Sequence, residues 1–268
     1  MGIKPVLSAR GMLSPYSFGN RKYLLKTIFH RIIGRFLLGK AMLHATSEQE
    51  AKECNGILPN WPMFVAPNFI NFSPVQPTFA RQEHSKKFQL LFLSRIHEKK
   101  GLELLFHALK TLPFSFEFYI TGTGVTEYIN QLKLLSNKLG LSSFIFWQPW
   151  ANEIEKYSQM SNSDLFVLPS YNENFANVVI ESLSVGTPVL LCNEVGLSDY
   201  VEKNNFGWVV DREVGAIANA LRLAYNDTEK RIEIRKRSPL QIRKDFAPNT
   251  IVDQYLAGYQ TVAYRSKK

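Results

Sequence analysis

Residues 165–192 read LFVLPSYNENFANVVIESLSVGTPVLLC, and this stretch decides the fold class. Its first four residues form an apolar run typical of a buried strand, and Val189 to Cys192 form a second such run. Between them, a loop that begins at Pro169 leads into a helix expected at residues 176–185. A strand, a helix and another buried strand in this order are the repeating unit of a parallel sheet.

The same alternation runs through most of the chain. We therefore expect an α/β fold with a Rossmann-like, doubly wound parallel sheet, preceded by an incomplete N-terminal α/β portion with short strands at 42–46 and 64–66. Ligands bind such sheets beyond the carboxyl ends of the strands, so the loops there form the candidate site. The predicted strands of the main sheet are 88–93, 116–120, 144–147, 165–168, 189–192 and 207–210, and the predicted helices are 102–111, 126–139, 152–161, 176–185, 197–202, 213–226 and 250–263.

Two carboxylates flank the start of the helix at 176–185. Glu173 lies just before it, and Glu181 lies roughly 12 Å further on at a rise of about 1.5 Å per residue. They can hold hydroxyls of one elongated ligand, but they are too far apart to share a proton. The free backbone N–H groups of Phe175, Ala176 and Asn177 suit a phosphate. The alternatives are a capping acid for Glu173 and a partly exposed helix residue for Glu181.

A basic loop follows the strand at 88–93. Residues 94–101 read SRIHEKKG and bring cations to a strand end, where an anion would be met. Arg95 can grip a diphosphate with its planar guanidinium, and Lys100 can act as a point charge. A solvated basic loop is the alternative, and we favour that alternative for His97 and Lys99.

A glycine-containing turn follows the strand at 116–120. Residues 121–124 read TGTG, and Glu127 stands where a dinucleotide fingerprint has its third glycine, so the turn alone is a weak sign. Gly122 and Gly124 are therefore candidates for ligand contact, or glycines that only permit a tight turn.

Composition and missing motifs exclude several other classes. The 268 residues are 45% hydrophobic and 21% charged, which is ordinary for a globular protein and excludes collagen-like or wholly disordered chains. Two cysteines cannot form a disulfide framework or a four-cysteine zinc site. No HExxH, GxSxG, CxxC or Walker motif is present, and the five histidines have no metal-ligand spacing. We therefore expect no metal site.

The positive charge is concentrated in the N-terminal part. Residues 1–80 carry nine Lys and Arg against three acids, and residues 1–47 contain no acid. A helix predicted at 21–40 has apolar residues at three- and four-residue steps and basic residues between them. We favour a helix packed on a core with a solvated basic face, and a helix on an anionic membrane surface is the alternative. No stretch is apolar enough to span a membrane, so we expect a cytoplasmic protein, peripheral on the inner face of the membrane.

The basic loop and the Glu173 segment, in this order, resemble the retaining glycosyltransferases of family 4. The residues that carry the resemblance are Arg95 with Lys100-Gly101, Gly122 with Gly124, Glu173 and Glu181 with seven residues between them, and Gly186-Thr187-Pro188. The resemblance implies the GT-B fold, in which two Rossmann-like domains face each other across a cleft. It implies a remnant of the acceptor-side domain at 1–80, a nucleotide-sugar-binding domain at 81–245, and a helix at 246–268 that crosses back to the N-terminal part.

The resemblance also implies roles for single residues. Arg95 and Lys100 would contact the donor diphosphate, Glu173 the donor sugar, and Glu181 the ribose hydroxyls. The backbone of Phe175, Ala176 and Asn177 would contact sugar or phosphate, and Gly122 and Gly124 belong to the same donor site. Ala176 departs from the family, which usually has glycine there. Its methyl group would crowd the closest backbone approach to the donor.

The expected function is transfer of a sugar from a nucleoside-diphosphate sugar to a glycan or lipid-linked acceptor, in the biosynthesis of cell-surface polysaccharide or lipopolysaccharide. The family implies retention of configuration without an essential metal or cofactor. The expected partners are the nucleotide sugar, the acceptor and an anionic membrane surface, with no nucleic acid. Because only part of an acceptor domain is expected, an inactive, truncated donor-binding module is one alternative. A nonhydrolysing sugar-nucleotide epimerase is the other.

Overall fold

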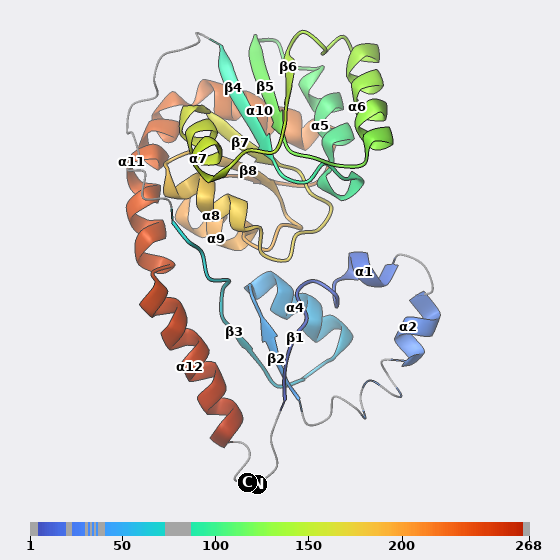
Figure 1. Cartoon of the computed structure of the whole chain (residues 1–268), viewed down its shortest axis with the longest axis vertical. Coiled ribbons are helices and arrows are strands. Elements are labelled where there is room, and N and C mark those ends of the chain that lie inside the picture. Colours follow the sequence, from blue (N-terminus) through green and yellow to red (C-terminus); the bar gives the residue numbers. More distant parts are fainter. Residues whose placement is uncertain are drawn as a thin grey trace. The chain divides into compact units, whose positions relative to one another are not determined.

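The computed structural model describes residues 5–19, 23–29, 32, 34, 36, 41–72 and 87–264. The chain divides into two compact units by its internal contacts. Unit 1 consists of Met1–Phe69, Asn172–Phe175 and Phe246–Lys268, and unit 2 consists of Ile70–Tyr171 and Ala176–Asp245. Figure 1 shows the elements of both units along the chain.

Unit 2 is built on a six-stranded sheet in the order β6-β5-β4-β7-β8-β9, and every neighbouring pair is parallel. The central strands are almost wholly apolar because both faces are covered, and Leu90, Phe92, Phe118 and Phe166 are fully buried. The doubly wound sheet predicted from the apolar runs is therefore confirmed. The strands are β4 (Phe88–Leu93), β5 (Phe116–Thr121), β6 (Ile145–Gln148), β7 (Leu165–Leu168), β8 (Val189–Cys192) and β9 (Gly207–Val210).

Helices connect these strands and lie on both faces of the sheet (Figure 1). One group packs α5 against α6 and α10, and the other packs α8 against α7 and α11. Apart from α11, their boundaries differ from the predicted ones by one or two residues, which is usual where helix ends fray. They are α5 (Leu102–Leu109), α6 (Thr126–Lys138), α7 (Glu153–Asn162), α8 (Asn177–Ser184), α9 (Ser198–Asn204), α10 (Val214–Asn226) and α11 (Thr228–Asp245).

The long helix α11 is absent from the sequence-based assignment. Its sequence is polar and strongly charged, and it contains Pro239, so it shows little of the apolar periodicity that marks a helix. One buried cation explains part of its position. The guanidinium of Arg235 donates to the carbonyl oxygens of Ser161 at 2.8 Å and Ser163 at 2.7 Å, and thereby satisfies carbonyl groups at the end of α7.

Unit 1 contains a three-stranded parallel sheet in the order β1-β2-β3. Its core includes Leu13, Leu43, Cys54 and Leu58. The short strands expected at 42–46 and 64–66 are present within a residue, whereas the short helix α1 was not expected. The elements are β1 (Val6–Ser8), α1 (Pro15–Gly19), α2 (Tyr23–Phe29), β2 (Met42–Ala45), α4 (Glu48–Ile57), β3 (Met63–Val65) and α12 (Pro248–Tyr264).

The start of α4 has an N-cap, but the Glu50 carboxylate bonds elsewhere. The Ser47 hydroxyl accepts the Glu50 N–H at 3.1 Å, as expected for an N-cap. The Glu50 carboxylate, however, accepts from the N–H and the hydroxyl of Thr46 and, at 2.7 Å, from the N–H of Gly11. Glu50 is buried, and it therefore ties the loop after β1 to the loop after β2.

The favoured interpretation of the basic helix at 21–40 is wrong for its described side chains. Leu24, Leu25 and Ile28 of α2 are all exposed, Leu24 to 72%, so these apolar side chains do not pack on a core. Part of the predicted 21–40 helix lies outside the described residues. Within the residues that the structure describes, no helix has the length and apolar character of a membrane span.

Candidate functional site

The predicted site loops of unit 2 follow the carboxyl ends of β4, β5, β7 and β8. In a parallel sheet these ends lie at one edge, where the ligands of such folds bind. Two of the loops are bonded directly to each other, since the Tyr171 N–H donates to the carbonyl oxygen of Lys99 at 2.8 Å. The basic loop and the start of the loop after β7 are thus bonded to each other within unit 2.

In the basic loop, Ile96 is buried and its neighbour Arg95 is exposed. Ile96 is buried, and its N–H donates to the carbonyl oxygen of Thr123 at 2.7 Å. The neighbouring Arg95 is exposed, so its guanidinium is available to a ligand. Lys100 is half-buried in the 3₁₀ turn Glu98–Lys100. The ring of His97 accepts the Lys99 N–H at 3.1 Å, so His97 caps this turn.

Gly122 and Gly124 bring two loops into close contact. A β-carbon at Gly122 would lie 1.9 Å from the carbonyl oxygen of Ser94, and one at Gly124 would lie 2.1 Å from that of Ile96. Only glycine permits this approach. The two glycines therefore allow the turn at 121–124 to pack against the basic loop, which is a structural role. Direct contact with a donor stays a prediction.

Ala176 adopts a backbone conformation that glycine adopts more easily. It precedes α8 with φ 67° and ψ 69°, in the left-handed region. Its carbonyl oxygen accepts the Val179 N–H at 2.9 Å, which closes the first turn. Asn177 is the first residue of α8 and is exposed, so the helix begins at the edge where a phosphate is expected.

The Glu173 segment belongs to unit 1, although the sequence-based domain at 81–245 includes it. Asparagines on both sides of Glu173 anchor it there: the Asn174 side-chain amide donates to the hydroxyl of Thr46 at 2.8 Å, and the Asn172 side chain accepts from Ser14 at 3.3 Å. Phe175 is buried and meets Phe246 edge-on at 6.2 Å. The side chain of Phe175 is thus a packing anchor, and Glu173 itself is half-buried.

Glu181 is on α8 and already has a basic partner. The Lys156 ammonium of α7 lies 2.8 Å from its Oε1, and both side chains are largely buried. Neither residue is near the other in sequence, so no local pattern could have indicated the pair.

Arg212, after β9, is another residue that the sequence did not single out. Its guanidinium lies 2.8 Å from Oε1 of Glu194, donates to the carbonyl oxygen of Tyr171 at 3.3 Å, and stacks 4.6 Å from the centre of the Tyr171 ring. One side chain thus joins the loops that follow β7, β8 and β9.

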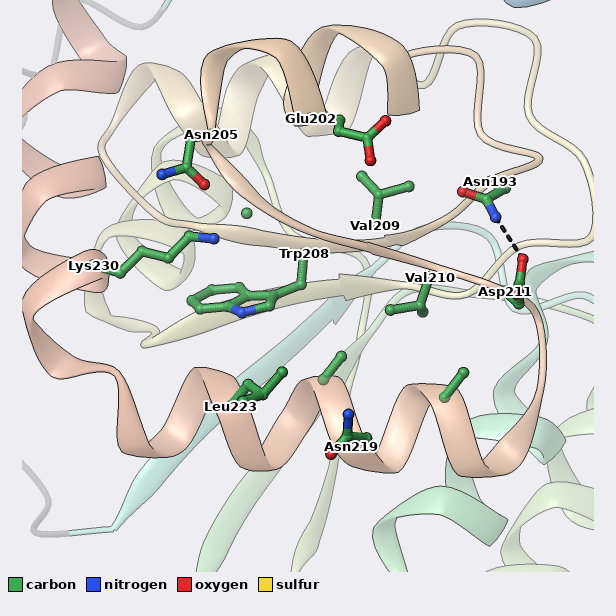
Figure 2. A pocket seen from close by; sticks show the side chains of 13 residues that line it. Asn193, Glu202, Asn205, Trp208, Val209, Val210, Asp211, Asn219, Leu223 and Lys230 are labelled. Atoms are coloured by element: carbon green, nitrogen blue, oxygen red, sulfur yellow. Dashed lines mark hydrogen bonds between the residues drawn. The ribbon is translucent and has the colours of Figure 1, made fainter.

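The described residues of unit 2 line hollows at two places of interest. One of about 340 Å³ adjoins the basic loop and is lined by Ile96, His97, Glu98, Val125, Glu127, Tyr128 and Gln131. The other, of about 580 Å³, lies along the edge strand β9, and no predicted donor residue lines it (Figure 2). There the Lys230 ammonium lies 4.6 Å from the centre of the Trp208 ring, and burial lowers the pKa of Lys230. Among the described residues, no group of three or more His, Cys, Asp or Glu is placed to hold a metal ion.

Comparison with known proteins identifies the class. The family model of the glycosyl transferases group 1 matches residues 76–241, and the chain belongs to this family. The D-inositol 3-phosphate glycosyltransferase of Arthrobacter sp. (strain FB24) is 28% identical over 188 residues, which are 66% of this chain and 45% of that protein. The lipopolysaccharide core biosynthesis glycosyltransferase LpsE of Rhizobium meliloti is 26% identical over 168 residues, 62% of this chain and 48% of that protein. The match therefore spans less than half the length of these relatives.

Solved structures agree on the fold. Sucrose-phosphate synthase from Thermosynechococcus elongatus matches with a TM-score of 0.80 at 19% identity, over 99% of this chain and 69% of that one. HepE from Anabaena, solved in complex with UDP and glucose, matches with a TM-score of 0.77 at 21% identity, over 96% of this chain and 72% of that one. Both likenesses support the GT-B fold.

Proposed function

We propose that this chain binds a nucleoside-diphosphate sugar and carries the donor side of sugar transfer to a glycan or lipid-linked acceptor. The observation that carries the proposal is the bond between Tyr171 and Lys99, because it joins the loop of Arg95 and Lys100 to the start of the loop after β7 within unit 2. Membership of the glycosyl transferases group 1 gives the reaction class. Relatives that act in lipopolysaccharide core and capsular polysaccharide biosynthesis support a cell-surface glycan as the product.

In the proposed reaction, positive charge stabilises the departing diphosphate. Arg95 is exposed beside the anchored Ile96, and Lys100 is in the same loop, so both can approach phosphate oxygens. The dipole of α8 adds partial positive charge at the same edge, where the helix begins. We propose that these groups suffice without an essential metal, and that the sugar is transferred with retention of configuration. Transfer in the presence of EDTA tests the first point, and the anomeric configuration of the product tests the second.

The test of donor binding replaces both cations. We expect Arg95→Ala combined with Lys100→Ala to weaken binding of UDP, GDP or ADP by about 100-fold, because each charged hydrogen bond contributes roughly 1.5–3 kcal/mol. The control is Lys110→Ala combined with Lys138→Ala, which removes two exposed lysines of the same unit. Calorimetry on the full chain gives the affinities. Equal affinity of the first double variant and the unmodified chain would overturn the assignment.

A donor-binding module without transfer activity is the second candidate, and the placement of Arg95, Lys100 and Glu181 together in unit 2 favours it. A screen of nucleotide sugars with mixed acceptors separates the two. A glycoside product supports the transferase, whereas donor binding without product or hydrolysis supports the module.

We also propose that α2 attaches the protein to an anionic membrane, on the cytoplasmic side where a nucleotide sugar is available. The exposed apolar side chains of α2 and the acid-free basic segment around it support this, because such helices lie in the lipid interface. Leu24→Ser combined with Leu25→Ser should reduce sedimentation with vesicles that contain phosphatidylglycerol. The control is Leu134→Ser combined with Ile154→Ser, which removes two equally exposed apolar residues of unit 2. Sedimentation that is independent of anionic lipid would refute the proposal.

A further inference from the structure

The carboxylate of Glu181 is held at one oxygen. Its Oε1 lies 2.8 Å from the Lys156 ammonium, and the two side chains are only 17% and 20% exposed. The other oxygen, Oε2, has no hydrogen bond in the part of the chain that the structure describes. Glu181 therefore presents one acceptor in a fixed direction, from a helix that begins at the candidate site.

Lys156 is itself held in place. Its helix α7 begins with a complete capping box between Asn152 and Glu155, with bonds of 2.9 and 3.0 Å. The next residue, Tyr157, is buried and donates its hydroxyl to the carbonyl oxygen of Asn71 at 3.1 Å. The Lys156 ammonium lies 4.7 Å from the centre of the Tyr157 ring, which favours a cation at that position. The position of the Lys156 ammonium is thus set by the capped start of α7, the face of the Tyr157 ring and one carboxylate oxygen of Glu181.

We propose that Lys156 is a positioning residue that sets the recognition of the donor ribose through Glu181. This rests on the proposed function. By holding Oε1, Lys156 directs Oε2 toward the ribose hydroxyls, and its charge offsets the repulsion between the carboxylate and the donor diphosphate. Without Lys156 the carboxylate could rotate, and its negative charge would oppose the phosphates. Lys156 should therefore affect the hydroxyl contact in particular, beyond any general effect on binding.

The experiment compares a nucleotide with its deoxy forms. UDP, GDP and ADP are tested on the full chain by calorimetry, and the tightest binder is then compared with its 2′-deoxy and 3′-deoxy analogues. The unmodified chain should bind at least one deoxy form about 10-fold more weakly, as expected for loss of one hydrogen bond to a charged group. Lys156→Met should weaken the parent nucleotide and reduce this ratio to about 2 or less, as Glu181→Gln should. In the Glu181→Gln background, Lys156→Met should change the ratio no further.

Matched variants separate positioning from structural damage. Lys133→Met removes a lysine of the same unit that lies over Trp147 and has no ion pair among the described residues, and it should keep the full ratio. Lys156→Arg keeps the charge and should keep most of the ratio between parent and deoxy nucleotide affinities. This variant also gives a measurement if Lys156→Met folds poorly. A wild-type ratio in Lys156→Met, with nucleotide binding intact, would overturn the role of Lys156 alone. Failure of every diphosphate to bind the unmodified chain would overturn the proposed function as well.

Discussion

A β-carbon at Gly101 would lie 2.2 Å from the carbonyl oxygen of Pro169. Gly101 ends the basic loop in the left-handed conformation with φ 71°, and Pro169 begins the loop after β7. The backbones of the two loops therefore touch at a point where no side chain fits. Together with the bond from Tyr171 to Lys99, this contact fixes the start of the loop after β7 against the basic loop within unit 2.

We expect Gly101→Ala to lower the free energy of unfolding by about 3 kcal/mol or more. An alanine there pays about 1–2 kcal/mol for the left-handed backbone and must also displace the carbonyl group of Pro169. The matched control is Gly140→Ala, where φ is 75° but nothing lies within 4 Å of the added carbon. That control should lose only the backbone contribution of about 1–2 kcal/mol. Urea unfolding of both variants measures the difference, and equal losses would show that the contact with Pro169 is unimportant.

We expect Ala176→Gly to stabilise the protein by up to about 1 kcal/mol. The left-handed backbone of Ala176 is strained for alanine, and glycine relieves this strain. The same change removes the methyl group at the start of α8, so nucleotide binding should not weaken. Asn205→Gly is the control, because Asn205 has φ 55° and asparagine tolerates this conformation. Thermal unfolding checks the order of the two effects, and a destabilised Ala176→Gly would contradict the expectation.

We expect Glu50→Gln to cost about 1–3 kcal/mol. The buried carboxylate accepts from the N–H groups of Gly11 and Thr46, and an amide nitrogen at either position would face another donor. Glu48→Gln, on the exposed side of the same turn, should change stability by less than about 0.5 kcal/mol. Urea midpoints of the two variants give the comparison. A loss confined to Glu48→Gln would mean that helix charge matters more than the buried bonds.

Both cysteines should be protonated and unreactive in the folded protein. Burial raises the pKa of Cys54 to about 12, with Glu50 and Glu53 adding to the effect, and burial likewise raises the pKa of Cys192 to about 12. Dithionitrobenzoate at pH 8 should therefore label neither thiol quickly in the native state, and both in guanidinium chloride. Rapid labelling of the native chain would contradict this.

The same pKa shifts predict weaker folding at alkaline pH. The fold favours the protonated thiols, so their contribution is fully present below about pH 9 and is lost as pH rises from about 9 toward 12. The urea midpoint should fall between pH 8 and pH 10, and it should fall less in Cys54→Ala than in the unmodified chain. An equal fall would assign the effect to other groups, such as Tyr128 and Tyr200, whose pKa values burial also raises.

The sheet of unit 2 could be predicted because its strands are buried on both faces. Each strand is then a continuous apolar run bounded by polar loops, and β7, β8 and β9 match the predicted residues. Helix α11 could not be found in this way, because buried bonds from Arg235 to two carbonyl groups, instead of an apolar stripe, fix part of its position. The exposure of the apolar face of α2 could not be predicted either, because periodicity shows that an apolar face exists but does not show what covers it.

The candidate site was predictable as a set of loops but not as a set of contacts. Arg95 and Lys100 follow a strand, and that position alone makes them candidates. The partners of these loops come from distant sequence: Lys156 reaches Glu181, and Arg212 reaches Tyr171 and Glu194. Gly122 shows the same limit. The sequence marks it as a candidate glycine, and only the structure shows that the carbonyl oxygen of Ser94 leaves no room for a side chain there.

The strand order β6-β5-β4-β7-β8-β9 also determines the order in which the strands can pair during translation. The central strand β4 is the first of the six to leave the ribosome. Each later strand then adds to an open edge, with β5 and β6 on one side and β7, β8 and β9 on the other. No strand has to enter between two that are already paired. The sheet can therefore grow outward while the chain is being translated, which limits the time that its apolar strands spend unpaired.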